Sequence, residues 1–193
     1  MQQRSEETQA RILDAALKNF SESGYDAASV DDICAEAGVS KGAFYHHFPS
    51  KQAVFLTLLN EWLKTVDASL EAARKPTVPE TLTNMARMLP TIFSQADGRL
   101  PMFLEFWLQA SRDETVWKAT IAPYQRYLDY FAELVKQGIE EGSFRPVDPR
   151  SAAQVIVSFA VGLLLQGLLA PENIDWQQTS EQSIRILMKG LAK

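Results

Sequence analysis

The segment Ser29–Lys51, SVDDICAEAGVSKGAFYHHFPSK, constrains the fold of this chain more than any other part. It predicts two short helices joined by a tight turn at residues 37–39, followed by a third helix that begins at Ser50. The second helix carries Phe44 and Phe48 on one face, and the first helix carries its own apolar face. Two short amphipathic helices that meet at a glycine-containing turn form a helix-turn-helix, whose second helix enters the major groove of DNA. The segment therefore predicts a DNA-binding motif.

The charge of the chain excludes a protein that coats nucleic acid without regard to sequence. The formal net charge is −5, and residues 1–52 hold eight acidic and five basic side chains. No Asp or Glu occurs from residue 37 to residue 60, and this window holds both histidines of the chain and two lysines. We therefore expect a small, locally basic surface whose DNA binding depends on fit and on dimerisation.

Every long segment repeats its apolar residues with helical spacing, which predicts an all-α fold. Ser29, Ser40 and Ser50 are predicted N-caps, and Asp32 stands in the capping-box position after Ser29. Further helices are expected near residues 5–23, 80–95, 100–111, 114–142, 149–170 and 176–192. Pro123 is expected to break or bend its helix, and the pair Asp148-Pro149 is a helix-start signal.

The chain is expected to form an N-terminal three-helix head and a larger C-terminal helical body. The head, residues 1–50, holds the helix-turn-helix, and the body comprises residues 51–193. A long helix over about residues 50–74 links the two, and the segment Lys75–Pro79 ends it.

The second helix of the motif is predicted to have a buried and a DNA-facing side. At 3.6 residues per turn, Phe44 and Phe48 centre the buried side, which leaves Gly42, Ala43 and His46 to face the bases. The small residues Gly42 and Ala43 let the backbone approach base edges, and Ala43 can contact a thymine methyl group.

Polar side chains beside this face supply hydrogen bonds. Lys41 and His46 are expected to donate to purine N7 or O6, while Tyr45 and His47 are expected to reach phosphate oxygens. Lys51 lies in the first turn of the following helix, near backbone amides that favour an anion, and is expected to clamp a phosphate.

Other interpretations apply to some of these residues. Tyr45 could be a half-buried core residue with its hydroxyl group at the surface. The adjacent histidines His46 and His47 point about 100° apart on a helix, and no third His exists to complete a site, so we expect no metal. The single cysteine, Cys34, fits a small buried hydrophobe better than a redox sensor.

The order of these residues resembles the signature of the tetracycline-repressor (TetR) family over about the first quarter of the chain. The matching residues are Phe20, Gly24-Tyr25, Ser29-Val30, Ile33, Ala37 to Gly42, Phe44-Tyr45, His47-Phe48 and Lys51. The resemblance implies DNA contacts at Ser29, Lys41, Gly42, Ala43, Tyr45, His46, His47 and Lys51. Asp31 departs from the pattern, because some members place a basic, base-reading residue there.

The segment 149–171 is the most apolar run, but it is not expected to cross a membrane. Polar residues interrupt it, so its apolar stretches fall far short of the roughly 20 residues required. Small or polar residues recur there every four positions, which allows close helix approach. Together with residues of the last helix they predict a homodimer interface, in agreement with the resemblance: Gln154, Ser158, Gly162, Ile184, Leu187, Met188 and Leu191.

Aromatic and methionine side chains are abundant between residues 62 and 159. Core packing explains most of them, but such a mixed lining also suits a cavity for an apolar or aromatic ligand. The resemblance implies an effector pocket in this body. Its candidate residues are Trp62, Phe93, Phe103, Trp107, Trp117, Tyr124, Phe159 and Gln166, with Glu105, Gln109 and Arg112 as further polar anchors.

These observations predict a ligand-responsive transcriptional repressor that binds a near-palindromic operator as a homodimer. A small hydrophobic or aromatic effector would release it. No cofactor and no catalytic set are expected, and the lone cysteine and the N-terminus without an apolar leader fit a cytoplasmic protein. The alternatives are a helical small-molecule-binding protein, with a head that contacts only protein, and an enzyme that uses the apolar pocket of the body.

Overall fold

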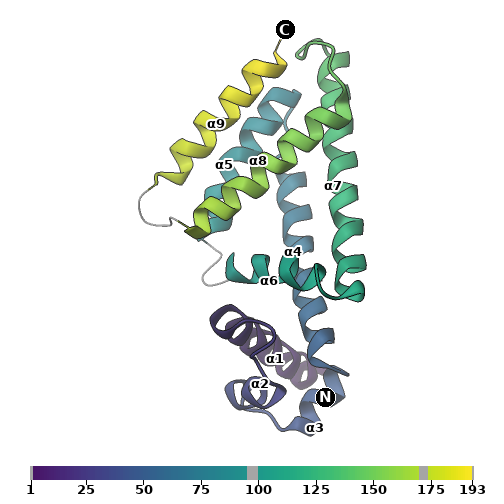
Figure 1. Cartoon of the computed structure of the whole chain (residues 1–193), viewed down its shortest axis with the longest axis vertical. Helices are drawn as coiled ribbons and strands as arrows, with labels where there is room; N and C mark the ends of the chain where they lie inside the picture. The colour runs from purple at the N-terminus through teal and green to yellow at the C-terminus, as the bar shows by residue number, and fades with distance from the viewer. Residues whose placement is uncertain (1, 95–99, 170–173, 193) are drawn as a thin grey trace. The chain divides into compact units, whose positions relative to one another are not determined.

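A computed structural model of the chain describes residues 2–94, 100–169 and 174–192. These residues form nine helices and no strand, which confirms the predicted all-α fold (Figure 1). The helices are α1 Gln2–Ser23, α2 Val30–Ala37, α3 Lys41–His47, α4 Lys51–Ala72, α5 Val78–Ser94, α6 Leu100–Ala110, α7 Glu114–Glu140, α8 Pro149–Leu169 and α9 Trp176–Leu191.

Packing divides the chain into two compact units. Unit 1 comprises Met1–Lys64 and Gly98–Thr120, and unit 2 comprises Thr65–Asp97 and Ile121–Lys193. Helices α1, α2, α3 and α6 therefore belong to unit 1, whereas α5, α8 and α9 belong to unit 2. Both α4 and α7 contribute residues to each unit. This division differs from the functional boundary predicted at residue 50, which stays a prediction.

Unit 1 is built around aromatic rings from four helices. Phe20 of α1, Phe44 of α3 and Phe55 of α4 are all fully buried. The ring centroids of Phe20 and Phe55 lie 5.7 Å apart in an edge-on arrangement, and Phe106 of α6 packs 4.7 Å from Phe55. Helix α6 is thus part of the core on which the helix-turn-helix rests.

The predicted helix starts are confirmed by their hydrogen bonds. The Ser29 hydroxyl accepts from the Asp32 amide, and the Asp32 side chain accepts from the Ser29 amide, which completes the capping box. The Ser40 and Ser50 hydroxyls each accept an amide at 3.1 Å, from Ala43 and Ala53. The turn between α2 and α3 depends on Gly38, whose φ of 62° lies in the left-handed region that glycine favours.

Unit 2 packs α5 and α7 against α8 and α9 around a large apolar core. Its most buried members include Leu82, Val135 and Ala153. Helix α7 runs without interruption through Pro123, so of the two outcomes expected there the break is wrong, and the bend stays a prediction. A proline removes only one backbone donor, and the long apolar faces on both sides keep the helix in place.

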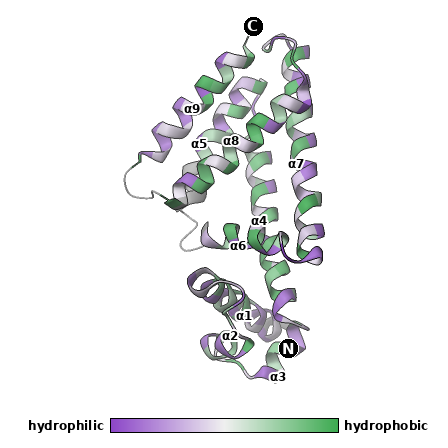
Figure 2. Cartoon of the chain, in the orientation of Figure 1, coloured by the Kyte–Doolittle hydropathy of each residue, from purple (hydrophilic) through white to green (hydrophobic). Residues whose placement is uncertain are grey.

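Helix α8 is, over Pro149–Gly167, long and apolar enough to cross a membrane if only its length and composition are considered. Figure 2 shows apolar residues along the helix with polar residues between them. Ala153, Ile156 and Val157 on this helix are buried in the core of unit 2. Its apolar character is therefore that of a core helix in a helical protein.

Candidate DNA-binding site

The turn that precedes α2 is held by a lysine of α4. The Lys51 ammonium donates to the carbonyl oxygens of Tyr25 and Ala28 at 2.7 and 2.8 Å. It also lies 4.3 Å from the centroid of the Tyr25 ring, and burial lowers the pKa of its ammonium group. The sequence did not indicate this structural role. The predicted phosphate clamp stays a prediction, and only one N–H of the ammonium is left for it.

Helix α6 and the turn that follows it hold the same segment from another direction. The Glu105 carboxylate accepts the Tyr25 amide at 3.0 Å, and Arg112 pairs with Asp26 at 3.3 Å. Both Glu105 and Arg112 are candidate polar anchors for an effector, a role that stays a prediction, and in this structure they contact the chain between α1 and α2. The orientation of the helix-turn-helix therefore depends on residues far along the chain.

Helix α3 presents the side that the sequence predicted for DNA. Lys41, Gly42 and His46 are exposed, while Phe44 and Phe48 are buried in unit 1. Two further candidates on this helix, Ala43 and His47, are half-buried. A seven-residue helix with one fully buried face leaves the other face free to enter a groove.

The remaining candidates are placed by local contacts. Tyr45 is 53% exposed, and its ring meets the edge of Phe44 at 5.3 Å, which places the side chain at the surface rather than in the core. The Ser29 hydroxyl is engaged in the capping box of α2. Cys34 is buried, and burial raises the pKa of its thiol, in agreement with its interpretation as a small core residue.

An ion pair links the starts of α2 and α3, and the sequence did not predict it. The Lys41 ammonium lies 2.7 Å from the Asp31 carboxylate, and this contact raises the pKa of Lys41. Asp31 is the position at which the chain departs from the TetR pattern. The residue found there is paired with Lys41 of α3, the helix predicted to enter the major groove.

Comparison with known proteins identifies the family. Residues 12–58 match the family described as bacterial regulatory proteins of the tetR family, and residues 80–192 match the C-terminal family of BetI-type transcriptional repressors. The chain belongs to the TetR family of transcriptional regulators.

Individual relatives agree with this assignment. The transcriptional regulator UidR of Escherichia coli (strain K12) is 23% identical over 193 residues, which cover 99% of this TetR-family chain and 96% of UidR. The fatty acid degradation regulator FadR from Bacillus halodurans has a structure with a TM-score of 0.82 at 24% identity, with 95% and 96% of the two chains covered. A regulator from Saccharomonospora viridis in complex with choline gives a TM-score of 0.81 at 21% identity, with 97% and 99% covered.

The predicted effector residues of this TetR-family regulator are distributed over both units. Trp62, Trp107 and Trp117 belong to unit 1, and the last two are exposed. Tyr124 and Phe159 are partly buried against the core of unit 2, whereas Gln166 is exposed. The side chains of Phe93 and Phe103 lie outside the described residues. A pocket shared by these residues stays a prediction.

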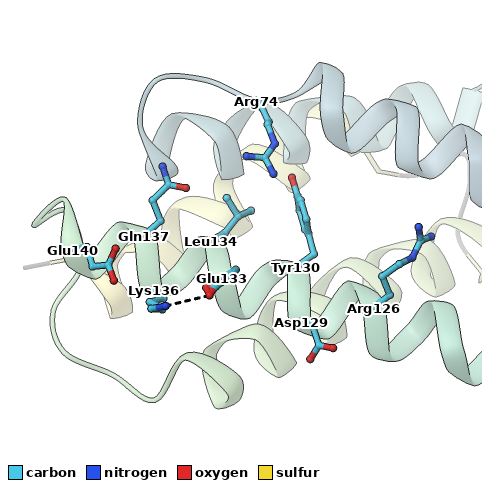
Figure 3. A pocket seen from close by; sticks show the side chains of 9 residues that line it. All are labelled: Arg74, Arg126, Asp129, Tyr130, Glu133, Leu134, Lys136, Gln137 and Glu140. Atoms are coloured by element: carbon cyan, nitrogen blue, oxygen red, sulfur yellow. Dashed lines mark hydrogen bonds and ion pairs between the residues drawn. The ribbon is translucent and has the colours of Figure 1, made fainter.

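A polar groove of about 590 Å³ lies on unit 2, along one face of α7 (Figure 3). Its lining is Arg74, Arg126, Asp129, Tyr130, Glu133, Leu134, Lys136, Gln137 and Glu140. Arg126 is held by Asp67 at 2.9 Å, and Lys136 by Glu133 at 3.3 Å. Tyr130 points toward Arg74, whose guanidinium lies 5.3 Å from the ring centroid. This mixed-charge lining differs from the aromatic and methionine lining that the sequence predicted.

The residues predicted for the dimer face of this regulator lie in different environments, and their place in a dimer stays a prediction. Ile184 is buried in the core of unit 2, because α9 packs on α5, and Leu187, Met188 and Leu191 pack against the same core. Gln154 and Ser158 are exposed, and the position of a Cβ on Gly162 faces open space. Among the side chains of α8 and α9 that the structure describes, the exposed large apolar ones are Val155, Leu165, Leu169 and Ile186.

Proposed function

We propose that this TetR-family regulator binds a near-palindromic operator as a homodimer and is released from it by a small effector, acting as a cytoplasmic repressor. The observation that carries the proposal is the exposed face of α3. Lys41, Gly42 and His46 are exposed on a helix whose opposite face, Phe44 and Phe48, is fixed in the core of unit 1. An exposed, rigidly mounted short helix of this kind can enter a major groove.

Binding would depend on shape more than on charge. The formal net charge of −5 gives no general attraction to phosphates, and the Lys51 ammonium is already bonded to two carbonyl oxygens. Lys41 is the only lysine on α3, and it is paired with Asp31. A single head would therefore bind weakly, and two heads on one duplex would be needed for useful affinity.

The exposed face of α8 supports the homodimer. Val155, Ser158, Gly162, Leu165 and Leu169 follow the alternating spacing of three and four residues that is typical of helix-packing seams. Leu169 on α8 and Ile186 on α9 are 75% and 71% exposed, which is a large apolar exposure for a folded chain. A second copy related by a two-fold axis would cover this face and present two α3 helices to one duplex.

The effector is proposed to be small and apolar or aromatic. The abundance of aromatic and methionine side chains between residues 62 and 159 supports this class. Structurally similar proteins include a fatty acid degradation regulator, a ketosteroid regulator and a regulator solved with choline, so the fold accommodates varied chemistry. Release requires that the effector bind more tightly to a dimer whose α3 spacing does not fit DNA, and a coupling of about 1–3 kcal/mol is typical.

Titration of duplex DNA from around the gene of this protein tests the proposal. Full-length protein is expected to shift one fragment at low protein concentration, and the affinity is expected to fall as salt rises from about 50 to 200 mM. A coding-region fragment of the same length is the control. Equal binding to both fragments, or none to either, would favour a helical small-molecule-binding protein or an enzyme over a regulator.

A further inference from the structure

The Asp31–Lys41 ion pair lies at the end of the helix-turn-helix that contacts bases. Lys41 is the first residue of α3, and Asp31 is the second residue of α2. Their side chains are 60% and 66% exposed, with the ammonium nitrogen 2.7 Å from a carboxylate oxygen. In a helix-turn-helix, the N-terminal residues of the second helix meet the base edges. Because the Asp31 carboxylate lies this close to Lys41, it would face the same base edges in the major groove.

The fold of unit 1 does not require this pair. The start of α2 is already closed by the reciprocal hydrogen bonds of Ser29 and Asp32, and the start of α3 by Ser40. An ion pair between two exposed side chains contributes little to folding stability. A carboxylate in the first turn of α2 favours that helix whether or not it contacts Lys41, so the folding of the head does not depend on the contact between the two side chains.

A G·C base pair has the complementary pattern in the major groove. Guanine presents the acceptors N7 and O6, and cytosine presents its N4 amino group as a donor. Guanine O6 and cytosine N4 are hydrogen-bonded to each other, so they lie about 2.9 Å apart. The Lys41 donor and the Asp31 acceptor, 2.7 Å apart, match this spacing with opposite polarity.

We propose that Asp31 and Lys41 read one G·C base pair together, with Lys41 donating to guanine and Asp31 accepting from the N4 amino group of cytosine. A T·A pair also offers an acceptor beside a donor, but its flanking groups differ. The purine N7 then lies on the carboxylate side, where it repels Asp31, and the thymine methyl group lies on the Lys41 side. In the reversed pair, C·G, the amino group of cytosine faces the Lys41 ammonium and the O6 atom of guanine faces the Asp31 carboxylate, so donor meets donor and acceptor meets acceptor. Asp31 is thus a specificity-determining residue.

The pair also limits binding to other sequences. As long as Asp31 neutralises Lys41, the ammonium group displaces few counterions from DNA, and binding without a cognate base pair gains little. Removal of the carboxylate frees Lys41 for any phosphate. The same residue therefore raises affinity for one base pair and lowers affinity for all others.

This inference rests on the proposed function, and one experiment separates the two. Duplexes are selected from a random pool with full-length wild-type protein, Asp31→Asn, Asp31→Ala and Lys41→Gln. Affinities are then measured by fluorescence anisotropy on the selected duplex and its point variants. Glu36→Gln is the matched control, because Glu36 lies on the same helix, carries the same charge and pairs with Lys18 at the same 2.7 Å.

The wild-type protein is expected to require G·C in one orientation at one position of each half-site, with roughly tenfold weaker binding to the other pairs. Both Asp31 variants and Lys41→Gln should relax that same position, while Glu36→Gln keeps the preference. In Asp31→Ala, binding to unrelated DNA should strengthen, and its dependence on log salt should steepen by about one unit for each protomer.

The inference is overturned if the Asp31 variants keep the wild-type preference at every position. It is also overturned if Lys41→Gln and the Asp31 variants relax different positions. A wild-type protein that enriches no sequence at all would overturn the proposed function itself, and the inference with it. Far-UV circular dichroism of each variant confirms that the head is folded in every comparison.

Discussion

The two short helices α2 and α3 and the two long helices α8 and α9 use their surfaces in opposite ways. Helices α2 and α3 have eight and seven residues, begin at serine N-caps and together bury Ile33, Cys34, Ala37 and Phe44 within unit 1. Helices α8 and α9 have 21 and 16 residues and leave Val155, Leu165, Leu169 and Ile186 exposed. The exposure of these four side chains does not mean that α8 and α9 lack a core to pack in, because other residues of both helices are buried in the core of unit 2.

The difference shows which kind of partner each region can accept. The exposed side of α3 carries the polar groups of Lys41, Tyr45 and His46, so water satisfies it until a polar ligand such as DNA replaces the water. The exposed side of α8 includes the apolar side chains of Val155, Leu165 and Leu169, and their exposure to water costs free energy until another protein surface covers them. The head is thus complete as one chain, whereas α8 and α9 are expected to need a second copy.

The largest expected effect comes from removing the buried ring of α3. Phe44→Ala deletes a fully buried phenyl group and should lower the free energy of unfolding by about 3–5 kcal/mol. Urea unfolding followed by circular dichroism measures this. Tyr45→Ala, its exposed neighbour, is the control and should change stability by less than about 0.5 kcal/mol.

At urea concentrations below the unfolding transition, the Phe44→Ala variant should still self-associate, because Phe44 lies in unit 1 and the proposed dimer face lies on α8 and α9 of unit 2. Size-exclusion chromatography with light scattering measures the mass of the assembly. Equal destabilisation by Phe44→Ala and Tyr45→Ala would remove the distinction between the buried and the exposed sides of α3.

A smaller effect is expected from a charge on the α8 stripe. Leu165→Glu should convert the dimer into monomers and weaken binding to a two-half-site duplex by roughly a hundredfold, since each head then binds alone. Sedimentation velocity gives the mass, and hydrogen exchange should show α2 and α3 still protected. Gln137→Glu, which adds the same charge at an exposed position of α7, is the control. A Leu165→Glu variant that remains dimeric would show that the seam lies elsewhere.

The smallest expected effect concerns the cap of α2. Ser29→Ala removes the capping hydroxyl and should lower the free energy of unfolding by about 1 kcal/mol at neutral pH. Hydrogen bonds from Ser29 hold the pKa of the Asp32 carboxyl below its ordinary value. The resulting stability is complete above the ordinary carboxyl pKa of about 3.9 and is lost as pH falls through the lower folded-state value.

Chemical unfolding at pH 7 and at about pH 3 tests this sign. The difference between wild type and Ser29→Ala should shrink at the lower pH, because protonation of Asp32 weakens the hydrogen bond that its carboxylate accepts from the Ser29 hydroxyl, and only the wild type makes this bond. A difference that is independent of pH would mean that the bond between the hydroxyl and the carboxylate adds no stability.

The sequence predicted those features that depend on neighbouring residues. Caps at Ser29, Ser40 and Ser50 involve hydrogen bonds over three positions, and the buried and exposed sides of α3 follow from helical periodicity alone. The family resemblance reached further, because its residues span the whole motif in a fixed order. These parts of the structure agree with the prediction to within a few residues.

Contacts between distant segments could not be predicted in the same way. The bond from Glu105 to Tyr25 joins residues 80 positions apart, and nothing local marks Glu105 as its partner. Ile184 is one of four apolar residues of the last helix that were predicted to join a dimer interface, and its burial in the core of unit 2 depends on the packing of α9 on α5, which no local pattern indicates. The Asp31–Lys41 pair likewise depends on the angle between α2 and α3.

The central claim is that α3 reads DNA through its exposed face, and the double substitution Lys41→Ala, His46→Ala tests it most directly. Its dissociation constant is measured on the duplex selected by the wild-type protein, and on the same duplex with altered bases. The account predicts at least tenfold weaker binding and a relaxed preference among the altered duplexes. Unchanged affinity with unchanged preference in a folded, dimeric variant would contradict it.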